Sequence, residues 1–214
     1  MTELILLCED LFGIEILELI NQINLRSVQN NCIPKYKVLG YLSNKKAPFG
    51  NISFPLQRLG SINDWQTSAG ERFVLGISKP ESKNYAVKVL KEKGARFETI
   101  IASWSTDTFL GISVGEGSIV WAYSVKRGIE IGNYVTVIGA MLSGKKIGDY
   151  STVLRFSNIA GSAVGTCTYV GNHVFLPVGK VIGDNCLIAD GSVIVKSVKD
   201  GAAVAGVPAK KLRR

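Results

Sequence analysis

The sequence has 214 residues, of which 46% are hydrophobic and 20% are charged, so the chain can bury a core and is not disordered in composition. Its four cysteines form no CxxC pair and accompany a single histidine, which argues against a zinc cluster and favours reduced thiols in a cytoplasmic protein. The apolar opening is too short to span a membrane and lacks the basic start of a signal peptide, so no membrane insertion is expected. The net charge is +8 without any nucleic-acid-binding motif, which favours a small anionic ligand over DNA or RNA.

The first hundred residues alternate between short apolar runs and segments with helical periodicity. This alternation predicts a small parallel α/β sheet, in which ligands bind at the carboxyl ends of the strands. Residues 43–57, which contain two prolines and a glycine, are expected to form a loop. The strands are predicted at 2–7, 37–42, 73–77 and 97–101, and the helices at 14–23 and 85–93.

A short motif recurs through the second half of the chain, from about Val114 to Val195. An aliphatic β-branched residue precedes a glycine and usually a small polar or acidic residue, at steps of 17, 16, 17 and 18 residues. Between these motifs, apolar residues tend to recur every sixth position. Three six-residue units form one coil of a parallel β-helix, with the aliphatic side chains stacked inside it. The predicted buried rungs are Ile131, Ile147, Val164 and Ile182.

The stretch Ala205–Lys210 reads Ala-Gly-Val-Pro-Ala-Lys. Together with the repeat and the order of the two parts, it resembles the hexapeptide-repeat sugar acyltransferases of the sialic-acid and bacillosamine type, which are N- and O-acetyltransferases. The resemblance implies a Rossmann-like domain over residues 1–103 that holds a nucleotide-activated amino-sugar. It also implies a left-handed parallel β-helix over residues 104–214 that binds acyl-CoA, in the first place acetyl-CoA. The chain would then act without a metal, as a homotrimer, in surface glycan biosynthesis.

The resemblance also suggests contact residues. In this group a Gly-rich, histidine-containing turn follows the first strand, whereas here Cys8–Gly13 keeps only its last glycine and places Glu9 and Asp10 where a phosphate would be repelled. Substrate contacts are therefore expected from other strand ends and from one corner of the β-helix: Ser43, Asn44, Ser78, Lys79, Lys83, Arg155 and Asn158. The expected cofactor contacts are Gly171, His173, Gly183, Gly206, Val207, Pro208 and Lys210.

The general base of the group, a histidine, has no counterpart here. The matching segment, Ala140–Asp149, contains no histidine, and the coil from Ile131 to Ile147 is two residues shorter than 18. Ser143 falls nearest the lost position, but a neutral hydroxyl is no base. The remaining candidate catalytic residues are Asp149, at a recurring corner position, and His173, which lies well over one coil further on.

Acyl transfer to an amine offers a route without a protein base, because a neutral amine is already a nucleophile, whereas an alcohol needs a base. The missing histidine therefore favours an N-acyltransferase. Two alternatives stay open on sequence alone. One is a catalytically silent β-helix protein that binds a sugar nucleotide or a partner, and the other is a sugar O-acetyltransferase that uses His173.

Overall fold

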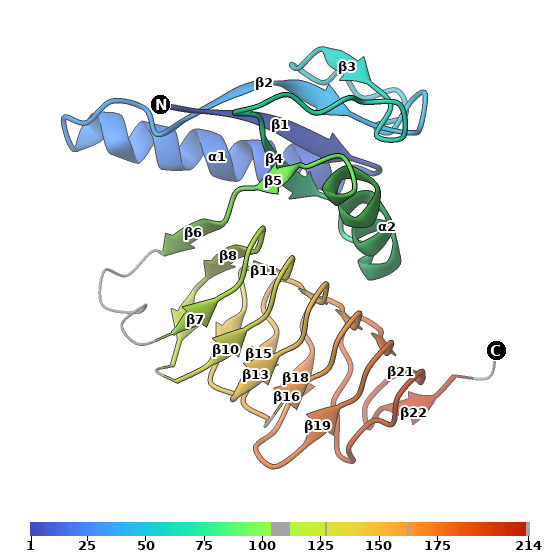
Figure 1. The fold of residues 1–214 in the computed structure, drawn as a ribbon. Helices are drawn as coiled ribbons and strands as arrows, with labels where there is room; N and C mark the ends of the chain where they lie inside the picture. Colours follow the sequence, from blue (N-terminus) through green and yellow to red (C-terminus); the bar gives the residue numbers. More distant parts are fainter. Residues whose placement is uncertain (104–111, 127, 162, 213–214) are drawn as a thin grey trace. The chain divides into compact units, whose positions relative to one another are not determined.

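The computed structural model shows two compact units (Figure 1). One unit comprises Met1–Ser78 and Ser82–Glu98, and the other comprises Lys79–Glu81 and Thr99–Arg214. The structure describes residues 1–103, 112–126, 128–161 and 163–212. None of the helices in this described part combines the length and the apolar character needed to cross a bilayer.

The N-terminal unit is built on a five-stranded parallel sheet with the order β3-β2-β1-β4-β5. The long helix α1 packs against β1 and β4 and buries its apolar side, including Ile16, Leu19 and Ile20. The central strand β1 is buried from Leu4 to Cys8. The elements are β1 (Thr2–Cys8), α1 (Phe12–Gln29), β2 (Tyr36–Leu42), β3 (Arg58–Gly60), β4 (Arg72–Gly76), α2 (Pro80–Lys91) and β5 (Arg96–Phe97).

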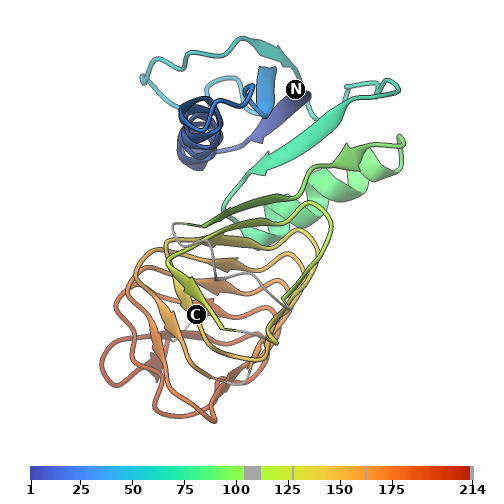
Figure 2. The ribbon, with the colours of Figure 1, turned by 90° about the vertical axis from the view of Figure 1, so that its left-hand side faces the viewer.

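The second unit is a parallel β-helix whose coils stack on one another (Figure 2). The β6 sheet contains β6 (Ile100–Ser103), β8 (Ile119–Ala122), β11 (Thr136–Ile138), β14 (Thr152–Val153), β17 (Tyr169–Val170), β20 (Leu187–Ile188), β21 (Ala203–Ala205) and the antiparallel β22 (Lys210–Lys211). The β7 sheet contains β7 (Ser113–Val114), β10 (Glu130–Ile131), β13 (Lys146–Ile147), β16 (Ala163–Val164) and β19 (Val181–Ile182). The β9 sheet contains β9 (Ser124–Val125), β12 (Met141–Leu142), β15 (Asn158–Ile159) and β18 (Phe175–Leu176).

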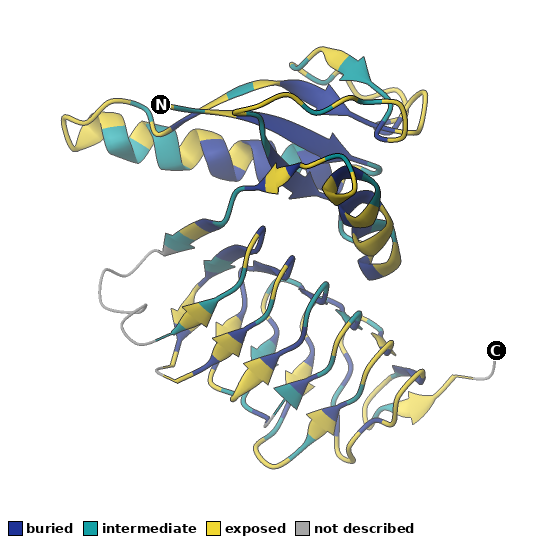
Figure 3. Cartoon of the chain, in the orientation of Figure 1, coloured by how far each residue is buried: buried dark blue, intermediate teal, exposed yellow. Residues whose placement is uncertain are grey.

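The predicted rungs are confirmed. Ile131 pairs with Ile147, Ile147 with Val164, and Val164 with Ile182 in successive strands of the β7 sheet. All four side chains are buried, and they belong to one core that runs through the β-helix (Figure 3). The pairing is in register because a one-residue slip would turn each aliphatic side chain outward.

Buried hydroxyl groups join neighbouring coils at the edges between sheets. The Ser151 hydroxyl donates to the carbonyl of Gly165, 2.6 Å away, and accepts from the backbone N–H of Thr168, 2.9 Å away. Ser118 and Thr168 make the same pair of hydrogen bonds on other coils, and Ser157 makes it at the next edge of the same coil. Each hydroxyl thereby satisfies backbone groups that the tight corners take out of the sheets.

Several elements differ from the prediction, and the first helix runs to Gln29 rather than ending near residue 23. The strand predicted over 97–101 is two strands: β5 ends at Phe97 in the N-terminal sheet, and β6 pairs with β8 in the β-helix. The second helix begins at Pro80 rather than near residue 85, since proline is well suited to the first turn of a helix. The short strand β3, which follows the predicted loop 43–57, was not predicted and pairs with β2.

Candidate functional site

Exposed rings gather along the edge between the β6 sheet and the β9 sheet. The Phe156 ring stacks on the Tyr123 ring, with centroids 5.8 Å apart, and on the His173 ring, with centroids 4.9 Å apart. The Arg155 guanidinium lies 5.4 Å from the centre of the Trp121 ring. We call these five residues the aromatic edge. They come from three different coils of the β-helix, so the stack runs along its length.

The backbone of this edge is unusual for such large side chains. Phe156 and His173 have φ angles of 60° and 56°, in the left-handed region that bulky residues rarely adopt. On the next coil the same position is Gly191, with a φ of 70°, and a Cβ there would meet nothing within 4 Å. The ring stack therefore ends at His173 beside open space over Gly191, and a flat group bound there would extend it.

The His173 imidazole has no hydrogen-bond partner for its ring nitrogens among the residues that the structure describes. Its backbone N–H donates to the carbonyl of Arg155, 2.9 Å away, while its exposed ring is positioned by stacking on Phe156. A histidine that serves as general base is normally oriented by a third group that fixes its tautomer. Among the described residues, the His173 ring is held by stacking on Phe156 and not by a hydrogen bond to such a group.

The three candidate catalytic residues lie on three different edges. His173 follows β17 on the aromatic edge, and Ser143 follows β12 at the edge between the β9 and β7 sheets. Asp149 follows β13 at the edge between the β7 and β6 sheets, where its Oδ1 accepts the N–H of Asn133 at 2.9 Å. The fold of one chain therefore does not bring them together, and Asp149 makes the corner hydrogen bond expected of its position.

Two of the glycines predicted to contact the cofactor have a packing role within the β-helix. A Cβ on Gly183 would lie 2.1 Å from Oδ1 of Asp200, and a Cβ on Gly171 would lie 2.1 Å from Oδ1 of Asp190. Those carboxylates accept backbone N–H groups one coil earlier, at Asp184 and Asn172. Glycine is thus needed where the corner carboxylate of the next coil crosses the backbone.

The remaining β-helix candidates are only partly brought together. Arg155 lies on the aromatic edge. Gly206, Val207 and Pro208 come directly after β21, and Gly171 comes directly after β17, which is a strand of the same sheet. Asn158 begins β15, beside Phe175 of β18 in the β9 sheet. Lys210 lies on β22 and is exposed.

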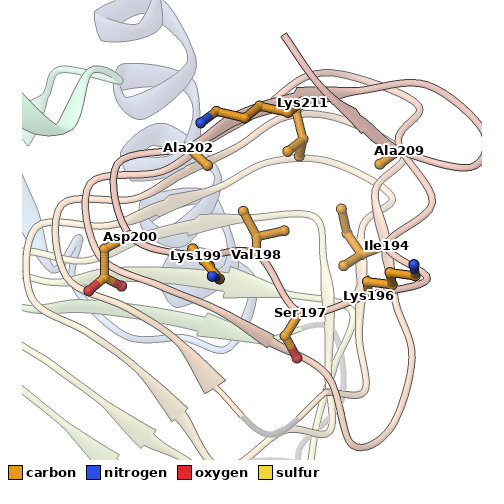
Figure 4. Close-up of a pocket in the computed structure, with 10 residues that line it drawn as sticks. Ile194, Lys196, Ser197, Val198, Lys199, Asp200, Ala202, Ala209 and Lys211 are labelled. Atoms are coloured by element: carbon orange, nitrogen blue, oxygen red, sulfur yellow. The ribbon is translucent and has the colours of Figure 1, made fainter.

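A hollow of about 350 Å³ lies at the last coil (Figure 4). Ile194, Val198 and Ala202 contribute apolar lining, while Lys196, Lys199 and Lys211 contribute positive charge. Of these lysines, none was predicted as a contact. The sequence shows that they are basic but does not show that they surround one hollow, because that depends on how the chain closes its last coil.

In the N-terminal part of the chain, three predicted contact residues, Ser43, Asn44 and Ser78, are engaged in hydrogen bonds within the chain. Ser43 is buried and its hydroxyl lies 3.4 Å from Oε1 of Glu9, which also accepts the N–H of Asn44 at 2.8 Å. The Ser78 hydroxyl donates to Oδ2 of Asp10 at 2.9 Å. The other two predicted substrate residues of this region differ in access, since Lys79 is exposed and Lys83 is fully buried.

Sequence reasoning also missed a pair of stacked tyrosines. The Tyr134 and Tyr150 rings are 5.1 Å apart at the edge between the β7 and β6 sheets, and the Tyr134 hydroxyl donates to Oε2 of Glu116 at 3.0 Å. Burial, followed by this hydrogen bond, raises the pKa of Tyr134 well above its ordinary value, so its hydroxyl stays protonated as a donor. The sequence could have indicated this pair, because Tyr134 and Tyr150 are separated by the length of one short coil.

The fold defines the class of the protein as a parallel β-helix that follows a small parallel α/β unit. No family model matches the sequence. Over 50 residues the chain is 36% identical to a galactoside O-acetyltransferase of Escherichia coli (strain K12). That match covers 23% of this chain, and it spans 25% of the length of that relative.

Solved structures match over nearly the full length. The acetyltransferase domain of PglB from Neisseria gonorrhoeae FA1090, in complex with acetyl coenzyme A, matches with a TM-score of 0.74 and 15% identity, over 98% of each chain. PerB from Caulobacter crescentus, in complex with CoA and GDP-perosamine, matches with a TM-score of 0.72 and 15% identity, over 100% of this chain and 98% of that one. A mutant of GDP-perosamine N-acetyl transferase from the same organism, again with CoA and GDP-perosamine, matches with a TM-score of 0.65 and 14% identity, over 100% and 98%. The predicted resemblance is therefore confirmed at the level of the fold, with the β-helix matching that of hexapeptide-repeat acetyltransferases.

Proposed function

We propose that the protein is an N-acyltransferase that moves an acyl group, in the first place acetyl, from acyl-CoA to the amine of a nucleotide-linked amino-sugar. The observation that carries the proposal is the nearly full-length match to an acetyltransferase domain that binds acetyl-CoA and to proteins that bind CoA and GDP-perosamine. In this proposal the enzyme acts in the cytoplasm, in surface glycan biosynthesis. The N-terminal unit is then the Rossmann-like domain for the nucleotide-sugar, and the β-helix binds acyl-CoA.

The proposed acyl-CoA site follows the aromatic edge. The rings of Phe156 and His173 provide a flat apolar surface, and the open space over Gly191 continues it toward Gly206–Pro208. Lys196, Lys199 and Lys211 around the last-coil hollow offer cations for the phosphates of the cofactor. In a homotrimer, a neighbouring β-helix would supply the other wall of the groove.

The proposed mechanism needs no protein base. The neutral amine of the sugar attacks the thioester carbonyl carbon, forming the C–N bond, and collapse of the tetrahedral intermediate breaks the C–S bond. The proton lost by the amine is taken up by the leaving thiolate, so the products are an amide and free CoA thiol. This route is supported by the separation of His173, Ser143 and Asp149 on three edges and by the lack of a described group that orients the His173 ring.

The same separation also favours a second candidate, a catalytically silent protein that binds a sugar nucleotide or a partner chain. An O-acetyltransferase using His173 is supported by the exposure of the imidazole and by the short match to a galactoside O-acetyltransferase. Calorimetry with acetyl-CoA separates the silent protein from both enzymes, because only an enzyme of this kind needs to bind the cofactor.

Acyl-CoA-dependent release of free thiol, measured against a panel of amino-sugar nucleotides and their hydroxyl counterparts, tests the N-acyltransferase. The expected result is thiol release with an amino-sugar nucleotide and formation of its amide, seen by mass spectrometry. Binding of acetyl-CoA with release only on hydroxyl acceptors would replace the proposal with the O-acetyltransferase. Absence of acetyl-CoA binding would leave the silent protein.

A further inference from the structure

The carboxyl ends of β1, β2 and β4 meet at one edge of the N-terminal sheet. Glu9 and Asp10 follow β1, Asn44 lies two residues beyond the end of β2, and Ser78 lies two residues beyond the end of β4. The 18-residue helix α1 begins at Phe12, directly after this turn. In a parallel sheet this edge is the usual ligand position, and the first N–H groups of the helix are a natural site for an anion.

Asp10 already occupies the start of α1. Its Oδ1 accepts the N–H of Phe12, the first residue of the helix, at 3.0 Å. Its Oδ2 accepts the hydroxyl of Ser78 from the end of β4 at 2.9 Å. A phosphate oxygen at the start of the helix would seek the same two donors. The Asp10 carboxylate therefore lies where such an oxygen would bind. Because it belongs to the chain, it is always present at this position.

Glu9 likewise accepts a hydrogen bond from a donor just beyond the end of β2. Its Oε1 accepts the backbone N–H of Asn44 at 2.8 Å, and the Lys45 ammonium contacts the carbonyl oxygen of Glu9 itself. The Asn44 side chain is also engaged, since Nδ2 donates to Oδ1 of Asn63 and Oδ1 accepts from Ser61 at 2.9 Å. The backbone N–H and the side chain of Asn44 are thus held by groups of the chain rather than presented to a ligand.

We propose that Glu9 and Asp10 form a built-in anion that fills the phosphate position of the N-terminal sheet and excludes nucleotide phosphates from the start of α1. A nucleoside diphosphate approaching this edge meets two carboxylates of its own sign and finds their donors taken. Insofar as the proposed function holds, the acceptor is recognised at this edge by its sugar, and its phosphates lie away from α1. The exclusion itself does not depend on the reaction.

Titration of the full chain with GDP and with inorganic pyrophosphate tests the proposal, using the backbone amide resonances of Phe12 and Asn44 as site-specific reporters. In the wild-type protein these two resonances should not move. The double variant Glu9→Gln/Asp10→Asn keeps the side-chain sizes but removes both charges. In this variant the two resonances should move, and the affinity fitted from their shifts should be at least tenfold higher than the upper limit set by the wild type. Glu3→Gln is the matched control, because Glu3 forms an exposed ion pair with Lys37 at the other end of β1.

Asp10→Gly is the second variant, since it vacates the start of α1 even if asparagine still fills it. Movement of the Phe12 and Asn44 resonances in the wild-type protein overturns the proposal. So does the absence of tightening in both charge-removing variants while circular dichroism shows them folded. If the variants unfold, the wild-type titration alone decides. No acyl-CoA is present in these titrations, so failure of the acyl-transfer assay is a separate outcome.

Discussion

Replacing His173 with asparagine tests whether the imidazole acts as a general base. Asparagine tolerates the φ of 56° at this position, so the ring is removed with little disturbance of the backbone. The ring stacks on Phe156 with centroids 4.9 Å apart, and such a pair contributes about 0.5–1.5 kcal/mol. Since about 1.4 kcal/mol corresponds to a tenfold change in an equilibrium or rate, the lost stack accounts for roughly tenfold in kcat/KM at most.

Removal of a true general base costs far more, about a hundredfold to ten-thousandfold. The assay is thiol release from acetyl-CoA with the preferred amino-sugar, and the rate of the wild type should rise with pH until the acceptor amine is mostly neutral. Phe156→Ala is the control, because it breaks the same stack but keeps the imidazole group in the chain. A loss of a hundredfold or more in His173→Asn, with Phe156→Ala within about tenfold and both variants folded, would refute the base-free mechanism and restore the hydroxyl acceptor.

Ile147→Ala should lower the free energy of unfolding by about 2–5 kcal/mol, because it removes a fully buried rung, whereas the exposed neighbour Lys146→Ala should change it by less than about 0.5 kcal/mol in the same urea titration. Gly183→Ala should lower the melting temperature, and adding Asp200→Gly should recover part of the loss, because the new methyl group would meet that carboxylate. Light scattering should give three times the 23.1 kDa mass of one chain, and a monomer mass would exclude the homotrimer.

The interior of the β-helix could be predicted from sequence because its physics is local and repetitive. Each inward side chain must stack on the next, so the spacing of Ile131, Ile147, Val164 and Ile182 determines the register of the β7 sheet. The alternation of apolar runs in the first hundred residues likewise predicts β1, β2, β4 and both helices. Periodicity cannot assign a strand to a sheet, however, and so the run 97–101 was not divided between two sheets.

The edges could not be predicted in the same way, since their chemistry depends on the neighbouring coil. Gly183 appears in the sequence as a residue that permits close approach, but the sequence does not show that Asp200, 17 positions later, is the residue that approaches it. The stack of Tyr123, Phe156 and His173 joins side chains from coils of unequal length, so its register follows only from the folded chain. The partners of Glu9 and Asp10 come from β2 and β4, which the sequence places close together without fixing which donors meet them.

The unequal coils explain why the aromatic edge forms where it does. Inward residues on the β6 and β9 sheets are five positions apart across this edge at Val137 and Leu142, but six apart at Val153 and Ile159. The shorter turn carries Gly139, and a Cβ there would lie 3.4 Å from both Tyr123 and Arg155. Without that side chain, Tyr123 reaches across the short coil to Phe156. The two residues missing from the coil between Ile131 and Ile147 are thus lost at two edges, one near Ser143 and one at the aromatic edge. The shortening therefore removes the expected corner for a base and also creates a continuous surface of rings.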